Sequence, residues 1–152
     1  MITLSQRDPK WADKFLGSSK LTIGKFGCTT CCISMLSDFF GCYKDPVEIQ
    51  KYQSYTNIDH PQGAGLILWD TLHLGPMKFE KRLYSRNDAE IQKSLKDPKK
   101  AVILEVDGKH WVVATGKVPL TNVYTIRDPW FGDRSTTLRY KKITGSAHYY
   151  SN

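Results

Sequence analysis

Residues 26–40, FGCTTCCISMLSDFF, decide the fold class because they combine a helical pattern with a cluster of thiols. Apolar residues recur at i, i+4 in two adjacent series, which are Cys31, Met35, Phe39 and Cys32, Leu36, Phe40. This spacing predicts a helix with one buried face, and a glycine such as Gly41 is a typical stop for it. Cys28 then lies in the first turn of this helix, beside Gly27 and off the main apolar stripe.

Three more segments in the first two thirds of the chain carry helix signals. Residues 45–55 open with Asp, Pro and a capping-box acid, so they predict a second helix. Residues 66–74, which end at a Gly-Pro pair, predict a short helix after the loop at 57–65. Asn87 followed by Glu90 predicts the start of another helix, which ends near Asp97.

From residue 101 the pattern changes from helical to extended. The runs AVILEV (101–106), WVVAT (111–115) and VYTI (123–126) are rich in β-branched and aromatic residues and are separated by turn sequences. They predict an antiparallel meander, continued by residues 136–140 and the Tyr-rich tail. Helices first and strands second indicate an α+β fold with segregated layers, an N-terminal helical half packed against a C-terminal antiparallel β-sheet.

Composition indicates one globular domain, residues 1–152, since 40% of the residues are hydrophobic and 24% are charged. The net charge is +7, but the basic residues are scattered, with short concentrations at 96–100 and 139–142. No zinc finger, RNP motif or basic helix accompanies them, so we expect a solvated basic surface and no nucleic-acid partner. Attraction to an anionic polymer such as a cell wall is a weaker alternative.

No segment has the length and apolar character of a signal peptide or a membrane span. We therefore expect no membrane span, and a protein that is cytoplasmic, phage-associated or released by a route without a signal. We also expect a monomer. In that setting four cysteines are expected to be thiols and not a disulfide framework.

The Cys28-x-x-Cys31 spacing by itself is compatible with a zinc site or a redox pair. A zinc site needs two more ligands at short spacing, and Cys42 and His60 do not supply them. A thioredoxin-like redox site needs a strand before the first cysteine, and the residues before Cys28 do not have a strand pattern. We therefore expect no metal and no cofactor, with Cys31 and Cys32 as small buried residues of the helix. Cys42 has no assigned role.

A nucleophilic role for Cys28 requires a proton partner, and the C-terminal strands contain one. If Thr115 faces Val123 across a hairpin, the facing residue numbers sum to 238 and His110 faces Asp128. Facing residues of two paired strands are close enough for a carboxylate to orient an imidazole. A helix N-terminus and a neighbouring imidazolium both stabilise the thiolate form of a cysteine. Acyl transfer also needs donors for an oxyanion, for which Gln6 is the upstream side-chain candidate.

The chain also resembles a known family. QRDPKWADKFLG (6–17), TIGKFGCTTCCISMLSDFFG (22–41), HWVVATG (110–116) and IRDPWFGD (126–133) are similar, in that order, to segments of the C39-like peptidases, a branch of the papain-like cysteine peptidases. The resemblance implies Cys28 as nucleophile, His110 as general base, Asp128 as orienting acid and Gln6 as oxyanion-hole amide. It also implies the papain-like fold, with the site in the cleft between the helical half and the sheet.

The expected activity is hydrolysis of peptide bonds, in a peptide or protein precursor or in bacterial cell-wall peptide. A catalytically inactive peptide-binding module and a related thiol acyltransferase or amidase are the alternatives. Asp128 is also suited to cap the turn at Pro129, a role compatible with orienting His110. In this family type an aromatic such as Trp130 can shield the bond between the acid and the histidine from water.

Overall fold

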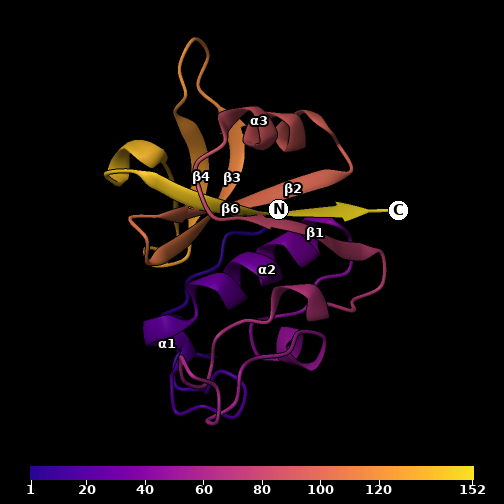
Figure 1. Ribbon diagram of the computed structural model, residues 1–152, viewed down its shortest axis with the longest axis vertical. Helices are drawn as coiled ribbons and strands as arrows, with labels where there is room; N and C mark the ends of the chain where they lie inside the picture. Colours follow the sequence, from indigo (N-terminus) through magenta and orange to yellow (C-terminus); the bar gives the residue numbers. More distant parts are fainter.

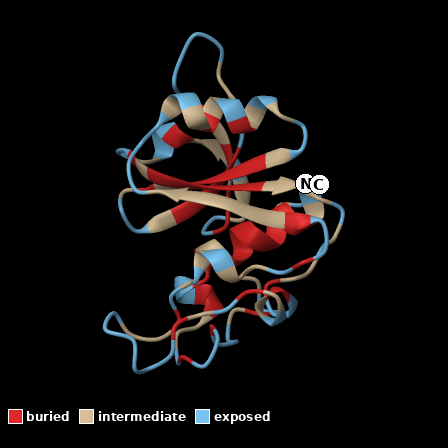
Figure 2. Cartoon of the chain, turned by 45° about the vertical axis from the view of Figure 1, so that its right-hand side comes forward, coloured by how far each residue is buried: buried red, intermediate tan, exposed pale blue.

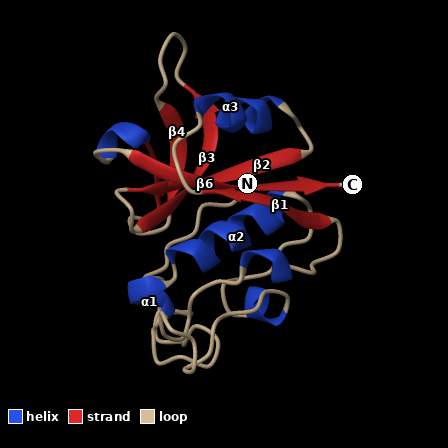
Figure 3. Ribbon diagram, viewed as in Figure 1, coloured by secondary structure: helices blue, strands red, loops and turns tan.

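The computed structural model describes residues 1–152 and has the α+β architecture expected from the sequence (Figures 1 and 3). The helices are α1 (Ile23–Phe26), α2 (Cys28–Phe39) and α3 (Asp88–Lys96), with short 3-10 turns η1 (Glu48–Lys51), η2 (Trp69–Thr71) and η3 (Thr137–Arg139). The strands are β1 (Met77–Leu83), β2 (Lys100–Val106), β3 (His110–Lys117), β4 (Tyr124–Asp128), β5 (Asp133–Thr136) and β6 (Ile143–Ser151). They form one six-stranded antiparallel sheet in the order β1-β6-β2-β3-β4-β5.

Helix α2 is the central buried element, and it is buried on nearly all sides and not on one face as its apolar spacing predicted; Phe39, at the end of the predicted stripe, is exposed. Cys31, Cys32, Met35 and Leu36 have no exposed surface, and Figure 2 shows the helix largely in the colour of buried residues. They share a hydrophobic core with Ile103 of β2 and with neighbouring strands. Burial of this stripe therefore fixes α2 against one face of the sheet.

Helix α3 covers the opposite face of the sheet, so the expectation of fully segregated layers is wrong. Ile91 of α3 belongs to a second core that contains Val102 and Leu104. Alternate residues of β2 thus enter different cores, because successive side chains of a strand point to opposite faces. The continuous apolar run of β2 matches a strand that is buried on both sides.

Three local predictions are also corrected. Residues 45–55 contain only the turn η1, although Asp45 Oδ1 accepts hydrogen bonds from the backbone N–H groups of Val47 and Glu48 as a cap does. Residues 66–74 contain only η2, and residues 136–140 form η3 in place of a strand. Strand β1 was not anticipated; its partner β6 lies more than sixty residues away, so its pairing has no local signal.

The Asn87 prediction is confirmed, since its side chain accepts a hydrogen bond from the Glu90 backbone N–H at 3.1 Å and α3 begins at Asp88. All four cysteines are free thiols. None of the helices combines the length and apolar character needed to cross a membrane.

Candidate active site

Cys28 is the first residue of α2, directly after the short helix α1. Gly27 joins the two helices, and its backbone N–H donates to Ile23 O at 2.8 Å. A Cβ atom at residue 27 would lie 2.6 Å from that same oxygen, closer than real Cβ contacts allow. Glycine at residue 27 is therefore required by geometry, because only glycine lets α1 and α2 approach this closely ahead of the thiol.

The backbone N–H groups at the start of α2 are open. The first backbone hydrogen bond to this turn is donated by Cys31, to Gly27 O at 2.9 Å, so the N–H of Cys28 has no partner within the chain. Unpaired N–H groups and the helix dipole favour negative charge at a helix N-terminus. The thiol of Cys28 and any anion formed beside it share this favourable position.

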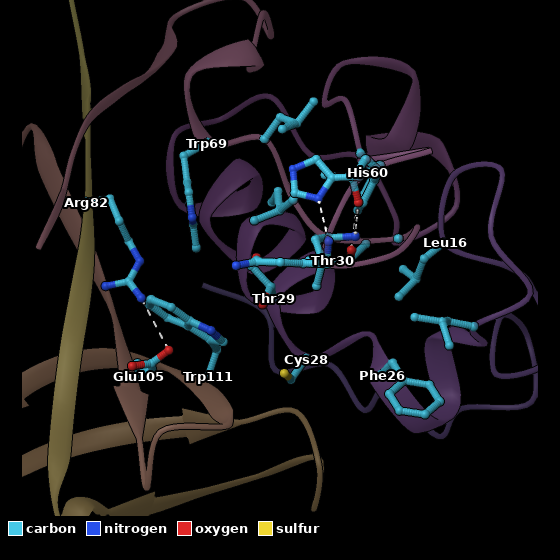
Figure 4. A pocket seen from close by; sticks show the side chains of 18 of the residues that line it. Leu16, Phe26, Cys28, Thr29, Thr30, His60, Trp69, Arg82, Glu105 and Trp111 are labelled. Atoms are coloured by element: carbon cyan, nitrogen blue, oxygen red, sulfur yellow. Dashed lines mark hydrogen bonds and ion pairs between the residues drawn. The ribbon is translucent and has the colours of Figure 1, made fainter. Parts of the chain in front are cut away.

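Cys28 borders a groove of about 860 Å³ between the helical half and the sheet. Figure 4 shows Cys28 between Trp111 of β3 and Phe26 of α1, with Thr29 and Thr30 further along α2. Cys28 is 8% exposed, whereas Phe26 is 55% exposed. The sulfur is thus within reach of a molecule in the groove, and the groove has an apolar rim.

His110 is placed at the start of β3 by a tight turn. Asp107 and Gly108 have φ angles of 54° and 68°, and the backbone N–H of Lys109 donates to Val106 O at 3.3 Å. Two consecutive positive φ values at the centre of a turn are typical of the type I′ geometry, for which Asp-Gly is a favoured sequence. Here Lys109 follows the turn, so three residues connect the paired residues Val106 and His110. The turn therefore fixes where β3 begins and sets His110 opposite Val106.

The hairpin register assumed from the sequence is wrong, although His110 and Asp128 are in contact. Gly116 faces Thr125, and after a bulge at Thr115 the ladder continues with Ala114 facing Ile126. One step beyond the last observed pair, Asp128 faces residue 112 and not His110. Because residues 110 and 112 are on the same side of the strand, His110 and Asp128 are diagonal neighbours. An unbroken ladder from the loop would have placed them on opposite sides.

His110 and Asp128 are hydrogen-bonded, with His110 Nε2 2.9 Å from Asp128 Oδ1. Since Nε2 is used in this way, Nδ1 is the ring nitrogen left for Cys28. Burial of the His110 ring alone would lower its pKa, but the hydrogen bond to Asp128 and the nearby Cys28 thiol outweigh burial and raise the pKa to about 9. The structure thus brings Cys28, His110 and Asp128 together, from a helix and two strands.

Asp128 is buried, with no exposed surface, and both of its oxygens are occupied. Oδ1 accepts from His110 and from the backbone N–H of Trp130 at 3.0 Å, which is the turn cap expected beside Pro129. Oδ2 accepts from Arg139 Nη1 at 3.0 Å and from the hydroxyl of Tyr140. Burial raises the pKa of Asp128, but the hydrogen bonds from His110 and Tyr140 lead a larger opposing effect and hold it below its ordinary value.

Arg139 and Tyr140 are site residues that the sequence did not reveal. In the sequence they are part of a short basic concentration, and the pattern of residues 136–140 predicts a strand. The turn η3 instead brings them against Asp128, eleven and twelve positions away. No motif or spacing in the sequence signals this contact.

Gln6 bridges the two halves of the site. Its backbone N–H donates to Pro129 O at 2.8 Å, directly after Asp128, and its side-chain Nε2 donates to Gly24 O in α1 at 3.2 Å. Gln6 is 1% exposed. Its amide therefore lies against the helix that leads into Cys28, and these contacts use one of the two Nε2 hydrogens.

The other cysteines and histidines are separate from this cluster. Burial raises the pKa of both Cys31 and Cys32. His148 is buried against α3, and His60 lies on the groove wall. The structure has no group of three or more His, Cys, Asp and Glu side chains suited to hold a metal ion.

Trp130 is 37% exposed, and the Arg7 guanidinium carbon lies 4.8 Å from the centre of its ring. The ring that lies against His110 is instead Tyr140, with ring centroids 5.5 Å apart. Tyr140 thus provides an aromatic cover for the imidazole as well as a hydroxyl for Asp128.

Comparisons with family models, with curated proteins and with solved structures find no match to this chain. The case for its function therefore rests on the residues and on their geometry.

Proposed function

We propose that this protein is a cysteine peptidase with a papain-like fold, of the C39-like type, which hydrolyses peptide bonds through Cys28, His110 and Asp128. The observation that carries the proposal is the hydrogen-bonded His110–Asp128 pair beside a cysteine at a helix N-terminus. A nucleophile, a base and a group that orients the base are the set that acyl transfer by a thiol requires. The motifs at 22–41, 110–116 and 126–133 support the same family assignment.

The reaction follows from the position of each group. The Cys28 thiolate attacks the carbonyl carbon, and the carbonyl π electrons move to the oxygen, where the Cys28 backbone N–H and the Gln6 side-chain amide donate hydrogen bonds. The His110 imidazolium gives its proton to the leaving nitrogen as the C–N bond breaks, which leaves a thioester on Cys28. Neutral His110 then takes a proton from water as the water attacks the thioester, and the thiolate is released.

The groove suggests an extended peptide as the substrate. Its lining is rich in aromatic and aliphatic side chains, such as Phe26, Leu66 and Trp111, and its charged groups include the paired Arg82 and Glu105. Apolar pockets of several hundred Å³ bind ligands mainly by removing apolar surface from water. Peptides with apolar side chains near the scissile bond are therefore expected to be cleaved faster than highly charged ones.

Cleavage in oxygen-18 water tests this function. The protein is incubated with a mixed peptide library and, separately, with purified cell-wall peptides, and the products are read by mass spectrometry. Hydrolysis predicts new carboxyl termini that carry oxygen-18, and Cys28→Ala should abolish them while the far-UV circular dichroism stays unchanged. Full turnover by Cys28→Ala would overturn the proposal.

The same assay separates the related activities. Products that retain an added amine in place of oxygen-18 would identify an acyltransferase. Saturable binding of peptides without any cleavage would identify a peptide-binding module. Both outcomes contradict the peptidase assignment.

A further inference from the structure

The contacts at Asp128 Oδ2 go beyond what an orienting acid needs. His110 uses Oδ1, while Arg139 and Tyr140 both donate to Oδ2 on the far side of the carboxylate. Arg139 is itself held in place, because its Nη1 and Nη2 lie 2.8 and 2.9 Å from the two oxygens of Asp133 and its guanidinium stacks on Phe131 at 4.2 Å. A cation fixed on two sides is therefore directed at the oxygen that His110 does not use.

These contacts have an electrostatic consequence for His110. A buried carboxylate stabilises an adjacent imidazolium, and a guanidinium on the same carboxylate opposes this effect. The titratable and charged groups that face the His110–Asp128 pair are Cys28 and the buried Cys32 from α2, together with Arg139 and the hydroxyl of Tyr140 from the segment after β5. Asp133 balances the second side of Arg139. The charge that reaches His110 thus depends on Arg139.

We propose that Arg139 and Tyr140 are positioning residues that act through Asp128: their contacts with Oδ2 partly offset the charge of this carboxylate and so set the pH range in which His110 can serve Cys28. The inference deepens the proposed peptidase function and rests on it for its biological meaning. The electrostatic part concerns the His110–Asp128 pair alone and is measurable without a substrate.

Titration of the His110 ring by NMR tests the proposal. The experiment uses the full chain in a Cys28→Ala background, so that ionisation of the thiol does not overlap with that of the imidazole. Arg139→Met removes the cation and keeps much of the side-chain volume. Arg134→Met is the matched control. Arg134 is an exposed arginine on the neighbouring strand β5, and its replacement removes the same charge from the protein.

The expected result is a rise in the His110 pKa of roughly one unit in Arg139→Met, because the full charge of Asp128 then acts on the imidazolium. Arg139→Lys should return the value most of the way to that of the background protein. Arg134→Met should leave it unchanged. An unchanged or lowered His110 pKa in Arg139→Met, or an equal rise in Arg134→Met, would overturn the proposal.

Tyr140→Phe provides a second test, which also applies if Arg139→Met does not fold. It keeps the ring that lies against His110 and removes the hydroxyl that donates to Asp128, so it predicts a smaller rise, about half a unit. No rise in this variant contradicts the role of Tyr140. Since none of these titrations needs turnover, a protein that fails to cleave peptides but shows the shifts would reject the peptidase function and retain the electrostatic arrangement.

Discussion

His110 Nε2 and Asp128 Oδ1 are 2.9 Å apart even though the two residues do not face each other across the β3–β4 hairpin. They are diagonal neighbours, and the bulge at Thr115 determines that they share one side of the ladder. The bond leaves Nδ1 for Cys28, which fixes the roles of the two ring nitrogens.

The cysteines are expected to differ strongly in their reactivity. Iodoacetamide should label Cys28 at least roughly a hundredfold faster than Cys31 or Cys32 at neutral pH, because burial both raises the pKa of those two thiols and blocks access to them. Peptide mass spectrometry reads each rate separately. His110→Ala should slow the alkylation of Cys28 and of no other cysteine. His60→Ala, which changes the groove wall, should leave the alkylation rate of Cys28 unchanged. Equal labelling of the three thiols would sink the assignment of Cys28 as the nucleophile.

The hydrolysis rate is expected to fall as the pH rises above about 9, where His110 loses the proton that it must give to the leaving nitrogen. The raised pKa also links protonation to stability. Since the folded-state pKa lies above the ordinary 6.5, this contribution to stability is complete below pH 6.5 and is lost as the pH rises through 9. A pH profile of kcat/KM, which reports the ionisation of the free enzyme, checks the first effect. A rate that stays constant to pH 10 would show that no proton donor with this pKa takes part.

Gly27→Ala is expected to displace the start of α2. The new methyl group would meet backbone atoms of Ile23, which cannot move aside as a flexible side chain can. We expect a loss of roughly 2 kcal/mol in the free energy of unfolding and slower alkylation of Cys28. Gly116→Ala is the control, because its methyl group would meet the side-chain oxygen of Thr125 at 3.1 Å. Urea unfolding and labelling rates measure the two effects, and wild-type values for Gly27→Ala would contradict the close contact.

Cys32→Ala is expected to destabilise the protein without affecting the reaction centre directly. Cys32 has no exposed surface and lies in the core between α2 and the sheet, so loss of its sulfur leaves a small cavity. We expect a cost of about 1 to 2 kcal/mol. The partly buried Cys42 offers a comparison, and Cys42→Ala should cost about 0.5 kcal/mol or less. If chemical denaturation finds the two variants equally stable, Cys32 is not a packing residue.

His148 is expected to make the fold sensitive to acid. Its Nδ1 and Nε2 lie 2.7 and 2.8 Å from the hydroxyl oxygens of Ser94 and Ser146. Burial, with a smaller contribution from Lys81, lowers its pKa from 6.5 to about 4. The unfolded chain therefore binds a proton at a higher pH than the folded chain does. The associated stability is present above pH 6.5 and is lost as the pH falls through 4, by on the order of 2 to 3 kcal/mol.

Urea unfolding at pH 7 and pH 4.5 measures this loss. Carboxylates such as Asp128 also change the stability in acid, so the informative quantity is the difference between the wild type and His148→Gln. The variant should lose less stability between the two pH values than the wild type does. Equal losses would exclude His148 as the cause.

Much of the fold was predictable from the sequence because its signals are local. The i, i+4 stripe from Cys31 to Phe40, the Asn87 cap and the β-branched runs from residue 101 depend on neighbours a few positions away. Residues 45–55 carried the same kind of cap signal, but only a 3-10 turn formed there. The residues that follow this turn contact another segment of the chain, since Gln53 Nε2 donates to Leu68 O at 2.6 Å.

For the candidate site, the sequence by itself determined that Cys28 begins a buried helix and that His110 and Asp128 belong to successive strands. The tertiary structure decided the rest: the bulge at Thr115, the approach of Arg139 and Tyr140 to Asp128, and the side of the sheet that α3 covers. The physical reason is that helix periodicity and capping act within one or two turns of the chain. Strand register and the ion pairs of a buried carboxylate depend instead on segments that meet only after the chain has folded.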